Sequence, residues 1–158
     1  MMEGERALLG LIHDASDETV HGAVAPDGRG ENPPRPLPAG MLGGSSRPAV
    51  ASEQLRVPSA LVAVNLPTAA IFSGSGLCPP LDRIGDIRVT GSLCLDLAWT
   101  AAGRFDACAY RHRDNPRDWA AGELIALSRG RVVLSAHWNG VAVVVAGRPD
   151  VAAALAGG

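Results

Sequence analysis

A stretch rich in proline and glycine, from Pro26 to Pro58, restricts the fold of this chain more than any other feature. Proline lacks a backbone N–H and has a fixed φ, so this stretch cannot form a long helix or an inner strand. We expect a long surface loop, with a short helix near Ala49–Leu55. Most regular structure must therefore lie before residue 26 and after residue 58.

The composition favours a folded protein of about one domain, which we assign to residues 1–158. Apolar residues make up 47% of the chain and charged residues 19%, which is typical of a globular core. Aromatic residues are scarce at 4%, so Val, Leu, Ile and Ala must supply most of the core. The net charge is −2 and no basic run is present, which argues against a nucleic acid or an anionic membrane as partner.

The cysteines and the chain start indicate a cytoplasmic protein. Cys78, Cys94 and Cys108 form no Cys-x-x-Cys pair, so we expect three reduced, small core residues. The first five residues are acidic where a signal peptide would be basic. The most apolar late run, Val141–Ala146, is far shorter than the roughly 20 residues that span a bilayer.

Short apolar runs predict strands on both sides of the proline-rich stretch. Ala7–Ile12 and Thr19–Ala25 flank a polar segment, residues 13–18, which is typical of an antiparallel hairpin. Ala60–Asn65 is a compact apolar run that precedes Pro67, and we expect a buried strand there. A Gly/Ser/Pro loop should follow, then one helical turn at Pro80–Ile84 and a short strand at Asp86–Val89.

The clearest helix begins after Ser92, a favourable N-cap, and ends near Gly103. A second helix is predicted from Asp118 to about Ser128. The remaining predicted elements are strands at Phe105–Tyr110, Arg131–Ser135 and Val141–Ala146, a turn at His137–Gly140, and a short helix from Pro149. The mixture indicates an α/β or α+β class, with these three strands in one sheet flanked by the two helices.

Two motifs carry a resemblance to a known family. The sequence GSLCLDLAWTAAGRFDA, at residues 91–107, resembles the signature of the inositol monophosphatase family, in which a Gly-Ser-(small)-(small)-Leu-Asp-Leu helix runs into Ala-Ala-Gly-Arg-(apolar)-Asp. The sequence PRDWAAG, at residues 116–122, is similar to the Trp-Asp-x-Ala-(Ala/Gly)-Gly motif of that family, with Arg117 where Trp is usual. Weaker similarity covers residues 7–36, 60–67 and 141–155. The resemblance implies the C-terminal portion of a layered αβαβα sandwich, truncated at its N-terminus.

The resemblance also implies Mg²⁺-dependent hydrolysis of a small phosphorylated metabolite, such as an inositol phosphate, and allows a homodimer. It assigns Asp118 as a metal ligand and Gly91 and Ser92 as substrate-binding residues. Residue chemistry alone leaves two alternatives for Asp118: an ionised carboxylate oriented by free backbone N–H groups of a helix start, which suits Mg²⁺, or a plain helix cap. We expect structural roles for Asp96 and Asp106, and a solvated side chain for Arg88.

Most of the family's metal ligands have no counterpart in this sequence. The family draws them from a Glu-Glu motif and an Asp-Pro-(apolar)-Asp-Gly-Thr motif, and the chain contains neither Glu-Glu nor Asp-Pro. We therefore assign no catalytic residue and expect impaired activity or none. Leu93 and Cys94 replace small residues and should narrow the pocket, and Tyr110 lies near the position of an acidic residue that often binds a substrate hydroxyl. The alternatives are a non-catalytic paralogue that dimerises with a partner, or a phosphatase for another small phosphate, such as histidinol phosphate or a 3′-phosphonucleotide.

Overall fold

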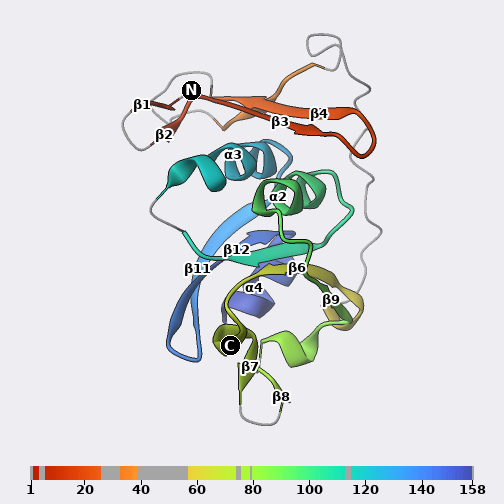
Figure 1. Cartoon of the computed structure of the whole chain (residues 1–158), viewed down its shortest axis with the longest axis vertical. Helices are drawn as coiled ribbons and strands as arrows, with labels where there is room; N and C mark the ends of the chain where they lie inside the picture. The colour runs from red at the N-terminus through yellow and green to blue at the C-terminus, as the bar shows by residue number, and fades with distance from the viewer. Residues whose placement is uncertain are drawn as a thin grey trace.

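The computed structural model describes residues 2–3, 6–25, 33–38, 57–73, 76–78, 80–112 and 115–157. These residues stack in four layers (Figure 1). A small sheet built on strands β3 (Leu9–Asp14) and β4 (Thr19–Val24) covers the helices α2 (Leu93–Ala101) and α3 (Ala120–Ser128). The two helices cover one face of a five-stranded sheet, and α4 (Pro149–Ala156) packs against the opposite face. The predicted mixture of helix and sheet is confirmed.

The five-stranded sheet is mixed and has the strand order β11-β12-β10-β6-β9. Its strands are β6 (Leu61–Asn65), β9 (Asp86–Arg88), β10 (Ala107–Tyr110), β11 (Val132–Trp138) and β12 (Val141–Gly147). β6 runs parallel to β10 and β9, whereas β12 runs antiparallel to β10 and β11. The prediction that β10, β11 and β12 share one sheet is confirmed. Asn65 pairs with Tyr110, so the carboxyl ends of β6 and β10 lie side by side.

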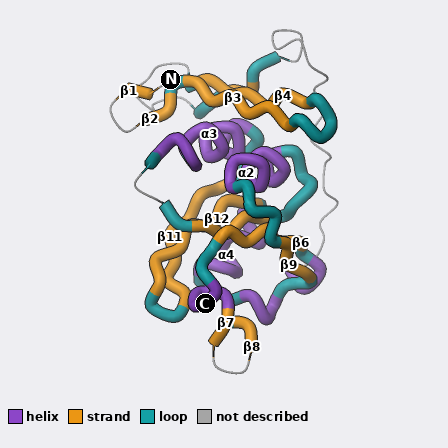
Figure 2. Tube along the Cα trace, in the orientation of Figure 1, coloured by secondary structure: helices purple, strands orange, loops and turns teal. Residues whose placement is uncertain are grey.

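Each interface between layers is a separate apolar cluster, because alternate residues of a strand face opposite sides of the sheet. Helices and strands alternate through the stack, as the tube in Figure 2 shows. The three clusters, from the hairpin layer to α4, are represented by Ile12, Ala23, Ala98 and Leu124; by Ala63, Leu97, Cys108 and Val144; and by Val62, Val64, Val145, Val151 and Leu155. Small and β-branched aliphatic side chains dominate, as the scarcity of aromatic residues predicts.

Glycine permits the close approach of α3 to its neighbours at two positions. A Cβ on Gly122 would lie 2.6 Å from the Cβ and Cδ1 atoms of Leu97, on α2. A Cβ on Gly10, in β3, would lie 2.8 Å from the carbonyl oxygen of Ala121. Both distances are too short for real carbon contacts, so the tight packing of the three layers depends on these two glycines.

The proline-rich stretch contains one strand that the sequence did not predict. β5 (Arg35–Pro36) pairs antiparallel with β4 and forms the edge of the hairpin layer. An edge strand tolerates proline, because one side of its backbone needs no partner in the sheet. The short helix predicted near Ala49–Leu55 lies outside the described residues. A small additional pair, β1 (Met2–Glu3) and β2 (Arg6–Ala7), precedes the hairpin.

Two further predictions were wrong. The turn between β11 and β12 was placed at His137–Gly140, but β11 continues to Trp138 and only Asn139 and Gly140 form the turn, both with positive φ. The loop predicted after Pro67 contains α1 (Thr68–Ile71) and a small hairpin of β7 (Phe72–Ser73) and β8 (Gly76–Leu77).

The 3-10 helix η2 (Val57–Ser59) was not predicted. The helical turn predicted at Pro80–Ile84 is confirmed as the 3-10 helix η3 (Leu81–Arg83).

No helix in the described parts of the chain has both the length and the apolar character needed to cross a membrane.

Candidate functional site

A pocket of about 310 Å³ opens where the carboxyl end of β6 meets the start of α2. Its lining consists of Asn65, Gly91, Ser92, Leu93, Cys94 and Asp118. The structure therefore brings together all three site residues that the sequence predicted: Gly91 and Ser92 from one segment of the chain and Asp118 from another. Ligand sites in sheets of this kind commonly lie beyond the carboxyl ends of parallel strands, which is where this pocket is found.

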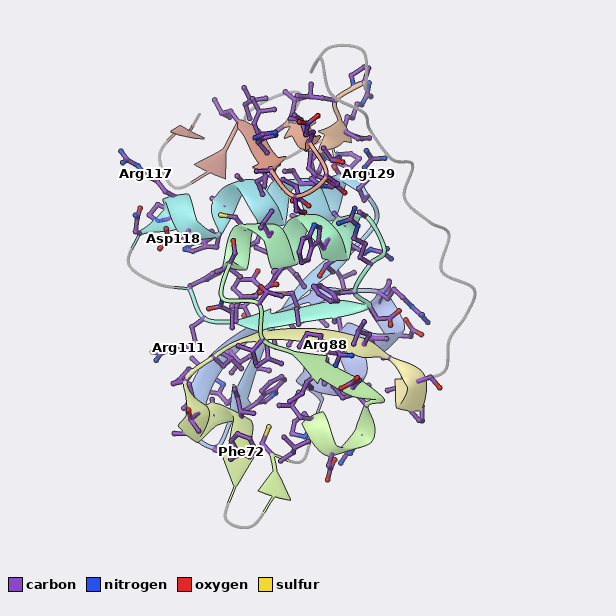
Figure 3. The ribbon with its side chains drawn as sticks, turned by 45° about the vertical axis from the view of Figure 1, so that its right-hand side comes forward. Phe72, Arg88, Arg111, Arg117, Asp118 and Arg129 are labelled. Carbon is purple, nitrogen blue, oxygen red and sulfur yellow. The ribbon has the colours of Figure 1, made fainter. Side chains whose placement is uncertain are left out.

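Asp118 enters the pocket from the 3-10 helix η4 (Pro116–Asp118), which precedes α3 (Figure 3). The side chain of Asn115 accepts a hydrogen bond of 3.2 Å from the backbone N–H of Arg117 and so begins the turn. The sequence placed Asp118 in the first turn of the following helix, and this placement was wrong. Pro116 starts a separate 3-10 turn, and the N-cap of α3 is Trp119, whose φ of −134° interrupts the helical path. The carboxylate of Asp118 is exposed rather than held against the N–H groups of α3.

Gly91 and Ser92 form the turn that leads into α2. Gly91 has a φ of +86°, a conformation that glycine adopts without strain. Ser92 occupies the N-cap position as predicted, but its hydroxyl makes no capping hydrogen bond. Its backbone N–H instead donates to the hydroxyl oxygen of Thr90, at 3.2 Å. The first N–H groups of an α-helix have no partner within the helix, so the start of α2 presents donors beside the pocket.

The remaining lining residues make one wall of the pocket less polar. Leu93 and Cys94, which the sequence analysis expected to narrow the pocket, both line it. The Cys94 thiol donates to the backbone carbonyl of Asp118 at 3.3 Å and so joins α2 to η4. Burial raises the pKa of the Cys94 thiol, and the negative charge of Asp118 raises it further. The thiol therefore stays protonated at neutral pH.

Asn65 is the lining residue that the sequence analysis missed. It ends β6, and its partner in the sheet is Tyr110 at the end of β10. A polar residue within the apolar run of residues 61–66 is the signal that could have identified it, because polar side chains at the carboxyl ends of parallel strands often contact ligands.

Tyr110 does not line the pocket, and its hydroxyl is engaged elsewhere. The hydroxyl donates to Glu123 Oε1 at 2.5 Å, and burial followed by the Glu123 charge raises the pKa of this tyrosine strongly. His112 Nε2 lies 2.6 Å from the same Glu123 oxygen, and its ring stacks on Trp119 at 4.1 Å between centroids. This cluster fastens the loop after β10 to the residue that follows Asp118.

The other charged residues singled out in the sequence have structural or surface roles. Asp106 accepts hydrogen bonds from the Leu61 N–H at 2.8 Å and from Arg148 at 3.0 Å. Arg88 forms an exposed ion pair with Asp86 at 2.5 Å and does not line the pocket. Asp96 is buried beneath the Gly91–Ser92 turn, and its Oδ1 accepts a hydrogen bond of 2.5 Å from the Thr90 hydroxyl.

The three cysteines are free thiols, as expected. Cys78 and Cys108 are buried in the core, while Cys94 is half-buried at the pocket.

In the part of the chain that the structure describes, no three His, Cys, Asp or Glu side chains converge as a metal site would require. The pocket contributes one carboxylate, from Asp118, together with the neutral oxygens of Asn65 and Ser92. Mg²⁺ sites normally use one or two carboxylates with water and substrate phosphate, so these residues could hold at most part of one ion's coordination shell. They do not fit a site for two ions.

Comparison with known proteins identifies relatives that are similar in sequence and in structure. The inositol-1-monophosphatase SuhB of Mycobacterium tuberculosis is 50% identical over 76 residues, which cover 46% of this chain and 25% of the relative. The inositol-1-monophosphatase of Mycobacterium leprae is 41% identical over 83 residues, covering 50% and 28% of the two chains. The structure of M. tuberculosis SuhB superposes on 98% of this chain with a TM-score of 0.64 and 26% identity. These comparisons support the resemblance to the inositol monophosphatase family.

The chain spans only part of the length of the relatives that it matches. The chain covers 60% of the M. tuberculosis SuhB structure and 57% of SuhB from Bartonella henselae, which matches with a TM-score of 0.66 at 18% identity. No family model matches the chain. The solved structures share the layered α/β fold of this chain.

Proposed function

We propose that this chain forms the substrate pocket of an inositol-monophosphatase-type phosphomonoesterase and binds a small phosphorylated metabolite there. The single observation that carries the proposal is the shared pocket, in which Gly91, Ser92 and Asp118 line one space of about 310 Å³. Such a volume, at the small end of ligand pockets, suits a metabolite of a few carbon atoms with one phosphate group.

The lining residues suggest how the phosphate and the rest of the ligand would be divided. Donors at the start of α2, next to Gly91 and Ser92, favour the phosphate oxygens. Leu93 and Cys94 form an apolar wall on which a carbon skeleton could rest. The exposed Asp118 carboxylate is the oxygen ligand that Mg²⁺ would take in this pocket. When bound, that ion supplies charge to neutralise phosphate oxygens and to activate a water molecule.

We further propose that this chain alone hydrolyses phosphate esters very slowly or not at all. Phosphomonoester hydrolysis by two metal ions needs several carboxylates around the ions, and Asp118 is the one carboxylate that lines the described pocket. Ligand binding and catalysis are therefore separable in this chain, and they need separate tests.

The test of binding uses Cys94 as a reporter. Cys78 and Cys108 are buried, so a small alkylating reagent at mildly alkaline pH should react first with Cys94 at the pocket. Inositol 1-phosphate with Mg²⁺, at ten times its Kd from calorimetry, should slow the alkylation of Cys94 by about 10-fold. Free inositol is the matched control and should protect less. Calorimetric binding without protection of Cys94 would place the ligand elsewhere and refute the proposed pocket.

The test of catalysis measures phosphate release from inositol 1-phosphate with and without Mg²⁺. We expect no release above the uncatalysed rate from the wild-type chain or from Asp118→Asn. Metal-dependent release that Asp118→Asn abolishes would show that the chain carries a complete site, which would refute the proposal of impaired activity. Release that survives Asp118→Asn would assign the activity to other residues.

A second candidate function is binding of another small phosphate ester in the same pocket. The observation that favours it is the Leu93–Cys94 wall, together with Tyr110, whose hydroxyl is held by Glu123 rather than directed to a ligand. The staphylococcal IMPase-II, which shares this fold at TM-scores of 0.63 and 0.61, has been solved with inositol monophosphate and with 2′AMP bound. Cys94 protection by histidinol phosphate or a 3′-phosphonucleotide at lower concentrations than by inositol 1-phosphate would support this candidate.

A further inference from the structure

Thr90 lies between a buried carboxyl group and the turn that lines the pocket. Its hydroxyl donates a hydrogen bond of 2.5 Å to Asp96 Oδ1 and accepts one of 3.2 Å from the backbone N–H of Ser92. Thr90 itself is exposed, whereas Asp96 has no exposed surface. One hydroxyl therefore connects a fixed group in the core to a backbone group at the pocket.

The chemistry of Asp96 sets the direction of this pair of hydrogen bonds. A carboxylate oxygen can only accept, so the Thr90 hydroxyl must direct its proton to Asp96 and its lone pair to the Ser92 N–H. Asp96 cannot turn away easily, because it belongs to the first turn of α2, where its own N–H donates to the Ser92 carbonyl at 2.9 Å. Its Oδ1 accepts from the Thr90 hydroxyl, and the side chain of Asn65 interacts with the same carboxyl group.

The turn needs such an anchor because of its sequence. Gly91 has no side chain and a φ of +86°, and a Cβ at this position would touch nothing within 4 Å. Neither packing nor steric restriction holds the glycine in place, so the backbone at residues 91–92 would be free to sample other conformations. The Ser92 hydroxyl does not cap the helix either. The hydrogen bond to Thr90 fixes the backbone at this point.

We propose that Thr90 is a positioning residue for the pocket: the Asp96–Thr90–Ser92 relay holds the Gly91–Ser92 turn in its ligand-binding geometry. This inference rests on the proposed function, in that the ligand is the small phosphorylated metabolite. A turn that is already ordered loses less conformational entropy when the ligand binds, which increases affinity without a direct contact. Asp96, for which the sequence suggested only a structural role, is the anchor of the relay.

The decisive variant is Thr90→Val, which keeps the shape of the side chain and removes the hydroxyl, compared with Thr90→Ser, which restores it. Calorimetry with inositol 1-phosphate, and with inorganic phosphate as the minimal probe, should show about 10-fold weaker binding for Thr90→Val, as expected for one lost hydrogen bond. Thr90→Ser should lie within about twofold of wild type. Thr68→Val is the matched control, since Thr68 is exposed and does not line the pocket, and it should bind as wild type does.

A second measurement needs no ligand and separates this inference from the proposed function. Hydrogen exchange of the Ser92 amide should be slow in the wild type, about 10-fold faster in Thr90→Val and slow again in Thr90→Ser. Unchanged Ser92 exchange in Thr90→Val would overturn the relay. Faster exchange in a protein whose wild type binds neither probe would support the relay and refute the proposed function.

Loss of the hydroxyl also removes one polar partner of the buried Asp96, which could unfold Thr90→Val. The double variant Asp96→Asn/Thr90→Val keeps the hydroxyl deletion and leaves no buried charge. The Asp96→Asn variant alone retains an oxygen that accepts from Thr90, and it should keep wild-type affinity and wild-type protection of Ser92. If the double variant matched Asp96→Asn in both measurements, the relay would be refuted.

Discussion

Asp96 and Asp106 are both buried aspartates, but their polar partners differ. Asp106 accepts hydrogen bonds from Arg148 at 3.0 Å and from the Leu61 N–H at 2.8 Å, so its charge has partners. Asp96 instead meets the side chains of Thr90 and Asn65, which are both neutral. Burial raises the pKa of Asp96, although the side chains of Thr90 and Asn65 offset part of the effect. Asp96 therefore destabilises the folded protein when it is ionised. Asp106, in contrast, is part of a stabilising ion pair with Arg148.

We predict that Asp96→Asn stabilises the protein by an amount that grows with pH. The pKa of Asp96 is higher in the folded state than in the unfolded chain, so its favourable contribution is complete below the unfolded pKa and is lost as the pH rises through the folded pKa. Asparagine carries no charge and avoids this loss. Urea unfolding at pH 4 and pH 8 should show little difference between variant and wild type at pH 4 and a clear gain for the variant at pH 8. An equal effect at both pH values would contradict the assignment.

Asp106→Asn should have the opposite effect. Removing one partner of a buried ion pair leaves the other charge incompletely compensated, which typically costs about 3–5 kcal/mol. Arg148 keeps its pair with Asp150 at 2.6 Å, so we expect a loss near the lower end of that range. The free energy of unfolding from urea titration at pH 7 measures it, with the exposed Asp82→Asn as the control. A loss below about 1 kcal/mol would show that the Arg148–Asp106 pair adds little.

We also predict that Asp118→Asn makes Cys94 more reactive. Burial raises the pKa of the Cys94 thiol most, and the negative charge of Asp118 raises it further. Removing that charge should therefore increase the thiolate fraction at pH 8. Alkylation of Cys94 at pH 8 should be faster in the variant, and the rates should converge at a pH above both pKa values. Arg117→Gln is a control next to Asp118 in the chain. Equal rates in wild type and Asp118→Asn at pH 8 would mean that the carboxylate does not face the thiol.

The contact between α2 and α3 determines where the two halves of the pocket meet. Gly91, Ser92, Leu93 and Cys94 come from the start of α2, and Asp118 comes from the turn before α3. Gly122 permits the close contact of the two helices, and the bond from Cys94 to the Asp118 carbonyl joins their starts. A change in the spacing of the helices would therefore widen the pocket as well as disturb the core.

Gly122→Ala should destabilise the protein and weaken ligand binding together. The new methyl group would lie 2.6 Å from Leu97, and overpacking of this kind costs about 1–3 kcal/mol. Gly76→Ala is the matched control, because nothing lies within 4 Å of its added Cβ. Urea unfolding and calorimetry with inositol 1-phosphate measure the two effects. A stable variant with wild-type affinity would show that the helices can move apart without consequence for the pocket.

The elements that could be predicted from sequence are the ones with strong local signals. α2 follows a Gly-Ser start and ends before Gly103, and β6, β10 and β12 lie in mainly apolar runs. α1 and the β7–β8 hairpin could not be predicted, because elements of two to four residues have no periodicity. The end of β11 was recoverable: Asn139-Gly140 is a typical two-residue hairpin turn, and burial of Trp138 beside the exposed His137 continues the alternation of a strand.

The residues of the candidate site that belong to a sequence motif could be predicted. The residues that reach the site only through long-range contacts of the fold could not. Gly91, Ser92 and Asp118 are fixed by the two family motifs, and the structure places them in one pocket. Asn65 reaches that pocket through the parallel pairing of β6 with β10, a long-range contact that no local pattern specifies. Thr90 likewise gains its role only once α2 places Asp96 beneath the turn.

At the scale of the whole molecule, the pocket lies at the boundary between the central helix layer and the five-stranded sheet. The hairpin layer lies on the other side of α2 and α3 and contributes none of the residues that line the pocket. Of its charged residues, Asp14 and Asp17 pair with Arg104 and so tie the hairpin to the end of α2. The layers therefore have different roles. The hairpin layer stabilises α2 and α3, and these helices together with the five-stranded sheet form the candidate ligand site.

This arrangement leads to a prediction for the whole chain, which is that Mg²⁺ alone leaves its stability unchanged. A ligand that binds only the folded state raises the free energy of unfolding by RT ln(1 + [L]/Kd), so a few millimolar Mg²⁺ shifts Tm only if its Kd is about millimolar or tighter. One exposed carboxylate beside neutral oxygens is a weak site for an ion that gives up water reluctantly. Inositol 1-phosphate adds phosphate oxygens to the same space, so the metabolite and Mg²⁺ together should raise Tm more than the sum of their separate effects. Thermal unfolding with each ligand alone and with both measures this coupling, with Asp118→Asn as the variant that should lose it. A rise in Tm with Mg²⁺ alone, absent in Asp118→Asn, would show that the folded chain holds the ion without substrate and that Asp118 has further ligands around it.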